Sequence, residues 1–238
     1  MRILAIDSSS LVAGIAVVED DKTIVEYNVN YKKTHSQTLL PMLEEVKKMT
    51  ELDLESLDYI AVSKGPGSFT GLRIGAATAK GLGLALKKEI IAIPTLEGLA
   101  YNLLGTNKLV CPIMDARRNQ VYTGIYKVVE EIAVVKDQDA MDIHDLIKIL
   151  NELEEEVVFL GDGVPVFKEV LKKELTKKPS FAPPHLNRQR AASYGALALV
   201  YAKNKKVEEA AMFRPDYLRK SQAERERVEA ENGRTKGN

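Results

Sequence analysis

The sequence predicts an α/β protein made of two duplicated subdomains, each with a central mixed sheet. Apolar, strand-like runs alternate with helix-like segments along most of the chain. The order of three strands, a helix, a strand, a glycine turn and a helix occurs twice. Each copy also opens with an apolar strand that ends in an aspartate, Asp7 in the first and Asp115 in the second.

The first copy begins with three strands and a helix. A polar turn at residues 20–22 separates the second strand from the third. Leu39, Leu43 and Val46 share one face of the helix, while Pro41 falls early in it and leaves its start open. The expected strands are 2–6, 13–19 and 23–31, and the expected helix is 36–49.

A buried strand at 59–63 leads into the turn Gly65-Pro66-Gly67. Both glycines can adopt the positive φ that a sharp turn needs, and Pro66 fixes the chain direction. A helix rich in small residues opens near Thr70 or Gly71. A strand at 90–93 and a helix at 96–104 with Thr95 as its N-cap complete the first copy.

The second copy repeats these elements after a boundary near residues 105–107. Its strands are expected at 109–114, 121–128, 132–135 and 157–160, and its helices at 143–153, 164–175 and 189–204. The proline-rich stretch 177–187 is expected to be a loop. The subdomains are therefore 1–105 and 106–220, and the polar tail 221–238 is either a solvated helix or disordered.

Two patterns around the glycine turn indicate binding. Small residues recur every four positions from Gly71 to Gly83, which places them on one helix face and lets another backbone approach closely. That backbone belongs either to the chain's own sheet or to another subunit, and we predict a subunit interface. Its residues are Gly71, Leu72, Gly75, Ala76, Ala79, Lys80 and Gly83.

The second pattern is a strand, a glycine loop and a helix N-terminus, whose free backbone N–H groups can hold an anion. The alternative is a turn whose glycines serve packing alone. The candidate phosphate-binding residues are Asp7, Ser8, Gly65, Gly67, Ser68 and Gly71.

Composition narrows the classes of function. Acidic and basic residues balance at 34 each, whereas a free-standing nucleic-acid binder usually has a strong basic excess. The single cysteine, Cys111, lies in an apolar run and is expected to be a buried thiol. Neither a signal peptide nor a stretch long enough to span a bilayer is visible, so we expect a cytoplasmic protein without membrane contact.

The first strand ends in Asp7-Ser8-Ser9, and a duplicated unit with this ending resembles the actin-like fold of sugar kinases, Hsp70 and acetate kinase. The fuller resemblance is to the bacterial TsaB (YeaZ) family of tRNA threonylcarbamoyladenosine biosynthesis, over residues 1 to about 226. The motifs that carry it, in order, are Ile6–Ser9, His35-Ser36, Leu39–Pro41, Gly65–Gly75, Asp115–Arg117, Val121-Tyr122 and Pro215–Arg219.

The resemblance implies a partner subunit that does not itself carry out the chemistry. It would activate a TsaD-type catalytic subunit that moves a threonylcarbamoyl group onto the adenosine next to the anticodon of tRNA. A TsaE-type small ATPase is a further implied partner, and the isolated chain is expected to form a homodimer. We expect no cofactor in the isolated chain, with ATP or ADP bound only in the complex.

The catalytic relative carries a His-x-x-x-His metal pair, and Thr95 and Leu99 stand at the two histidine positions. Leucine has no donor atom and a threonine hydroxyl is a poor ligand, so we expect no metal. The histidines His35, His144 and His185 show no ligand spacing. The alternative function is an independent enzyme, either a phosphotransferase that uses Asp7 and the glycine loop or a peptidase.

Overall fold

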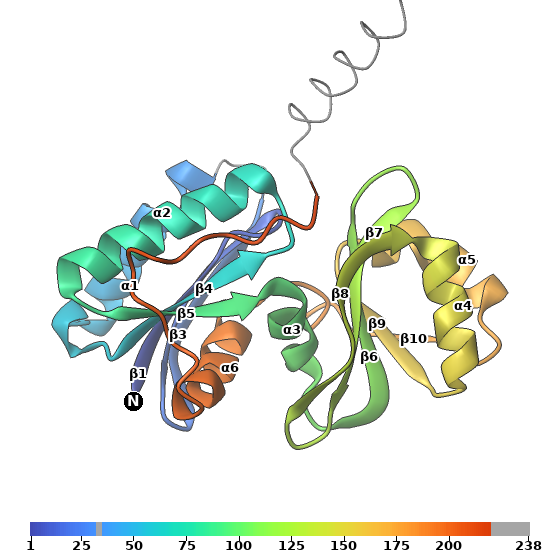
Figure 1. Cartoon of the computed structure of the whole chain (residues 1–238). Coiled ribbons are helices and arrows are strands. Elements are labelled where there is room, and N and C mark those ends of the chain that lie inside the picture. The colour runs from blue at the N-terminus through green and yellow to red at the C-terminus, as the bar shows by residue number, and fades with distance from the viewer. Residues whose placement is uncertain (32–34, 220–238) are drawn as a thin grey trace, which may run out of the picture.

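The structure, a computed structural model, describes residues 1–31 and 35–219 and contains two five-stranded sheets of the same topology (Figure 1). The strand orders are β3-β2-β1-β4-β5 and β10-β9-β6-β7-β8. In both, the first strand lies at the centre, with an antiparallel hairpin on one side and two parallel strands on the other. The prediction of a duplicated α/β unit is therefore confirmed. The predicted tail, 221–238, lies outside the described residues.

The elements of the first copy are β1 (Arg2–Asp7), β2 (Val12–Glu19), β3 (Lys22–Asn30), α1 (Leu39–Thr50), β4 (Tyr59–Gly65), α2 (Phe69–Leu86), β5 (Glu89–Pro94) and α3 (Thr95–Ala100). Those of the second are β6 (Thr106–Asp115), β7 (Gln120–Val128), β8 (Ile132–Asp142), α4 (Ile143–Leu153), β9 (Val157–Leu160), α5 (Val164–Glu174), β10 (Ser180–Phe181) and α6 (Ala191–Lys203).

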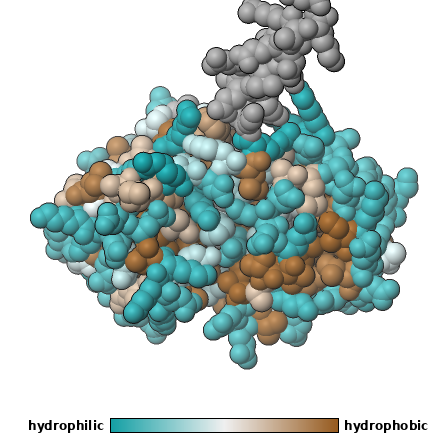
Figure 2. All heavy atoms as spheres, in the orientation of Figure 1, coloured by the Kyte–Doolittle hydropathy of each residue, from teal (hydrophilic) through white to brown (hydrophobic). Residues whose placement is uncertain are grey.

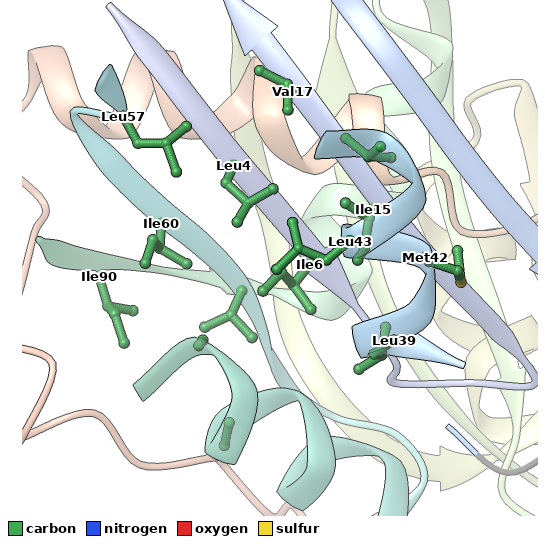
Figure 3. Packing of buried hydrophobic residues seen from close by; sticks show 14 of the residues in the cluster. Leu4, Ile6, Ile15, Val17, Leu39, Met42, Leu43, Leu57, Ile60 and Ile90 are labelled. Atoms are coloured by element: carbon green, nitrogen blue, oxygen red, sulfur yellow. The ribbon is translucent and has the colours of Figure 1, made fainter. Parts of the chain in front are cut away.

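Strand β1 shows why the first sheet is covered on both faces. Leu4 and Ile6 point into one core, where they pack with residues of α1 and α2, while Ile3 and Ala5 point into the opposite core against α6. All four side chains are fully buried. Figure 3 shows the first of these cores, in which strand residues such as Leu4 and Ile6 meet Leu39 and Leu43 of α1. A strand buried on both faces reads as a continuous apolar run, as this one does.

The third helix of each copy packs beside the other copy's sheet. Helix α3 follows β5 but contributes Leu96 and Leu99 to a core with Val110 of β6 and Tyr126 of β7. Helix α6 belongs to the second half in sequence, yet it lies against β1 and β2. The predicted division into 1–105 and 106–220 therefore does not match the packing in one respect. Helix α6 lies within 106–220, but its apolar face is buried on the first sheet.

Several predicted boundaries are also corrected. The helix expected at 36–49 consists of a 3₁₀ turn, His35–Gln37, followed by α1. Helix α3 ends at Ala100, and its N-cap is Pro94 in place of the predicted Thr95. Strand β8 extends to Asp142, and the stretch predicted as a loop contains β10.

Candidate functional site

The small-residue ridge of α2 packs inside the chain. A Cβ at Gly71 would overlap the carbonyl oxygen of Ser8, and one at Gly75 would lie 2.5 Å from Ser8 Oγ. At the far end, a Cβ at Gly83 would lie 2.7 Å from the Cβ of Ala210. The close backbone approach that these glycines permit is therefore to the loop after β1 and to the C-terminal segment.

The predicted interface residues are consequently in the wrong place for contact with another subunit. Six of them are buried in the single chain: Gly71, Leu72, Gly75, Ala76, Ala79 and Gly83. The seventh, Lys80, donates from its ammonium group to the carbonyl oxygens of Ala211 (2.9 Å) and Phe213 (3.2 Å). Residues on the opposite side of α2, including Ala77, Gly81 and Leu84, are exposed.

The glycine loop is packed tightly against the end of β1 and the C-terminal segment. Gly65 has φ of 121°, which favours glycine, and a Cβ there would overlap the carbonyl oxygen of Asp216. A Cβ at Gly67 would overlap the carbonyl oxygen of Ser9, which accepts a hydrogen bond from the backbone N–H of Ser68 (2.7 Å). Packing alone thus explains these two glycines.

A cavity of about 490 Å³ lies between the two halves, at the carboxyl ends of β1, β4 and β6. Of the six candidate phosphate-binding residues, Gly67 and Ser68 line this cavity. The other four, Asp7, Ser8, Gly65 and Gly71, are not among its lining residues. Ser8 Oγ instead donates to the carbonyl oxygen of Gly71 (2.8 Å).

The opposite wall of the cavity comes from residues that were not predicted as site residues. Asp115, Arg117 and Tyr122 belong to the end of β6, the following turn and β7, and Asp162 follows β9. Arg219 lines the cavity from the C-terminal segment. The Asp115–Arg117 and Tyr217–Arg219 motifs were visible in the sequence, but their shared location depends on the packing of both halves.

Two carboxyl groups near the cavity have raised pKa values. Asp7 is fully buried, and burial raises the pKa of its carboxyl above the usual value. Its Oδ1 accepts from the backbone N–H of Ser9 (3.1 Å), while its Oδ2 has no hydrogen-bond partner among the described residues. Burial also raises the pKa of Asp162, whose Oδ1 accepts from the backbone N–H of Asp115 (3.1 Å).

The segment that corresponds to the relative's histidine pair is buried among other side chains. Thr95 and Leu99 are both fully buried. The ring of Tyr194 lies against Gly98, with three ring atoms 2.5–2.8 Å from where a Cβ would be, and its hydroxyl donates to the carbonyl oxygen of Thr95 (3.0 Å). Within residues 1–31 and 35–219, no three His, Cys, Asp or Glu side chains gather as metal ligands would. No helix in those ranges is long and apolar enough to cross a membrane.

Comparison with known proteins gives concordant results. Residues 27–227 match the family model described as TsaD, tRNA N6-adenosine threonylcarbamoyltransferase. A Bacillus subtilis protein named "tRNA threonylcarbamoyladenosine biosynthesis protein TsaB" is 36% identical over 233 residues, which cover 97% of this chain and 100% of the relative. A Haemophilus influenzae protein of the same name is 30% identical over 189 residues, covering 74% of this chain and 78% of the relative.

Solved structures agree on the fold. A Pseudomonas aeruginosa protein, described as similar to the peptidase YeaZ, superposes with a TM-score of 0.79 at 24% identity, covering 92% of this chain and 99% of the other. A polyphosphate/ATP-glucomannokinase from Arthrobacter superposes with a TM-score of 0.51 at 13% identity, covering 85% of this chain and 99% of the other. The duplicated sheets are thus those of an actin-like fold, and the chain belongs to the TsaB family of tRNA threonylcarbamoyladenosine biosynthesis proteins.

Proposed function

We propose that this chain is the non-catalytic partner subunit of a complex that transfers a threonylcarbamoyl group to the adenosine next to the anticodon of tRNA. In this role it scaffolds and activates a TsaD-type catalytic subunit in the cytoplasm. The observation that carries the proposal is the packing around Thr95 and Leu99. The Tyr194 ring packs against Gly98, and Thr95 and Leu99 supply no imidazole nitrogen of the kind that the histidine pair of the catalytic relative offers to a metal.

The outward face of α2, together with α1, is the proposed docking surface for the catalytic subunit. A Cβ at Gly81 would meet no atom of residues 1–31 and 35–219 within 4 Å, so no contact in this part of the chain requires glycine at the mid-helix position. Glycine in a helix interior costs about 1 kcal/mol relative to alanine, and a closely packed partner helix would offset that cost. Leu84 is 59% exposed beside it, and hydrophobic atoms appear on the surface over α2 (Figure 2).

Helix α1 extends the same surface. It lies next to α2 on one side of the first sheet, and its Leu40 is 58% exposed. A contiguous exposed apolar patch marks an interaction site, and Leu40 of α1 and Leu84 of α2 supply the apolar part of the proposed surface. The isolated chain forms its homodimer through this surface, so the homodimer and the complex with the catalytic subunit exclude each other.

Nucleotide and tRNA are engaged only within the assembled complex. In the isolated chain the backbone N–H groups of Ser68 and Gly71 already donate to the carbonyl oxygen of Ser9 (2.7 Å) and to Ser68 Oγ (3.2 Å), so these two donors do not serve a nucleotide phosphate. ATP or ADP binding therefore depends on the TsaD-type subunit, and a TsaE-type small ATPase supplies hydrolysis. The tRNA is contacted through the complex, consistent with the balanced charge of this chain.

Ala77→Arg tests the docking surface, because Ala77 is exposed on the outward face of α2. The variant should keep the wild-type melting temperature and bind the TsaD-type subunit of the same organism about ten- to a hundredfold more weakly. Calorimetry measures binding, sedimentation measures the homodimer, and tRNA modification is assayed with and without the chain. Val166→Arg, at an exposed apolar position on α5, is the matched control.

Unchanged binding by Ala77→Arg would place the interface elsewhere. Modification at full rate without this chain would refute the partner role. Turnover of ATP or peptide by the isolated chain would favour the independent-enzyme alternative.

A further inference from the structure

Residues 207–219, here called the strap, cross from the first half of the molecule to the second. Glu208 exchanges two backbone hydrogen bonds with Ile90 of β5 (2.8 and 2.9 Å). The strap then follows α2 and passes the glycine loop, where the backbone N–H of Asp216 donates to the carbonyl oxygen of Lys64 (2.6 Å). In Figure 1 it appears as the red segment that runs above the first sheet toward the second.

The first part of the strap is held firmly. Phe213 is fully buried and Ala210 nearly so, and both belong to the core formed by α1, α2 and the first sheet. The Lys80 ammonium group binds two strap carbonyl oxygens, those of Ala211 and Phe213. This part is therefore fixed to the first half by buried apolar contacts as well as by hydrogen bonds.

The last part of the strap contacts both halves of the molecule. The ring of Tyr217, which is 37% exposed, lies 4.4 Å from the ring of Phe69 at the start of α2. The Arg219 guanidinium group donates to the carbonyl oxygen of Ala116 in the turn between β6 and β7 (2.8 Å). Both residues line the cavity between the halves. A firmly anchored segment whose end reaches across a cavity has the construction of a latch.

We propose that Tyr217–Arg219 are a latch that holds the cleft between the two halves closed and that its release exposes the floor of the cavity. The strap stays attached through Phe213 when the latch opens, so release is local and reversible. The role is conformational and is separate from docking at the outward face of α2.

The cavity contains polar groups that a ligand could use once the latch is open. Ser9 is fully buried and lines the cavity, and its Oγ has no hydrogen-bond partner among the described residues. The positive end of α2 faces the same space through Ser68 and Phe69. An anionic group is the ligand chemistry that these donors favour. The latch thus controls access to a site in which the Ser9 hydroxyl has no partner among the described residues.

A cysteine at position 9 provides a probe of the opening. Ser9→Cys is nearly isosteric, and the native Cys111 gives little background because burial raises the pKa of its thiol to about 12. The alkylation rate by iodoacetamide is measured in the full chain, with the latch intact and with Tyr217→Ala and Arg219→Met combined. Losing one ring contact and one charge-assisted hydrogen bond should speed alkylation about ten- to a hundredfold.

Tyr31→Ala, at a tyrosine that is 67% exposed, is the control and should leave the alkylation rate unchanged. Hydrogen exchange on chains that retain Ser9 gives a second measurement. The latch variant should exchange faster at residues 67–70 and 116–120, while the core strands β1 and β6 keep their protection. Equal alkylation rates with and without the latch, or uniform loss of protection across the chain, would overturn the proposal.

Discussion

Replacing Gly71 with alanine should destabilise the chain, whereas the same replacement at Gly81 should stabilise it. Both glycines lie in α2, but only Gly71 packs against another part of the described chain. A Cβ at Gly71 would overlap the carbonyl oxygen of Ser8 and lie 3.2 Å from Cδ2 of His35. A Cβ at Gly81 would meet nothing within 4 Å. The pair therefore separates the packing of the ridge from the intrinsic preference of a helix for alanine.

The expected sizes follow from these contacts. Alanine in place of glycine stabilises a helix interior by up to about 1 kcal/mol, which is the expected effect at Gly81 when melting is measured at concentrations where the chain is monomeric. At Gly71 the overlap forces the start of α2 away from the loop after β1, and such overpacking costs about 1–3 kcal/mol. The shift also weakens the bond from Ser8 Oγ to the Gly71 carbonyl oxygen, which contributes about 1 kcal/mol. We expect a net loss of about 1–3 kcal/mol.

Thermal melting followed by circular dichroism measures both variants. For a chain of this size 1 kcal/mol corresponds to roughly 2–4 °C, so Gly81→Ala should melt about 2–4 °C higher and Gly71→Ala roughly 2–12 °C lower. Denaturant midpoints provide a second measure of the same free energies. If Gly71→Ala were as stable as Gly81→Ala, the ridge would not be packed against the end of β1, and the subunit-interface prediction for Gly71–Gly83 would stand.

Three further outcomes are expected. Asp7→Asn should raise the melting temperature at pH 8 and raise it less toward pH 4. Burial raises the folded-state pKa of Asp7, so the carboxyl favours the folded chain at low pH, and this contribution is lost as the pH rises through that pKa. A gain in melting temperature that is independent of pH would contradict the raised pKa. Cys111 should be alkylated slowly in the folded chain at pH 8 and rapidly in urea, and equal rates would mean that its thiol is accessible. Tyr194→Ala should cost about 3–5 kcal/mol in denaturant unfolding because it leaves a cavity beside Gly98, and a cost below 1 kcal/mol would show that Tyr194 does not fill this region.

Much of the fold could be predicted because local pattern and tertiary role agree in most elements. Helix α4 and strand β9 occur at the residues predicted for them, since their apolar periodicity matches the core that they cover. Predictions were wrong where this agreement fails. Strand β10 has two residues, too few for a periodic signal. Thr95 is a good N-cap by type, but its hydroxyl is buried inside the molecule.

The sequence by itself determined the duplication, the position of the glycine turn and the family motifs, because these depend on residues close together in the chain. Tertiary structure alone decided which surface each feature faces. The four-residue spacing from Gly71 to Gly83 places small residues on one side of a helix but contains no information about what covers them. The residues that cover these glycines are Ser8 and Ala210, which lie far from α2 in sequence. The cavity likewise forms only when the ends of both central strands and the strap meet, and a contact between such distant segments leaves no periodic pattern for a reader of the sequence to find.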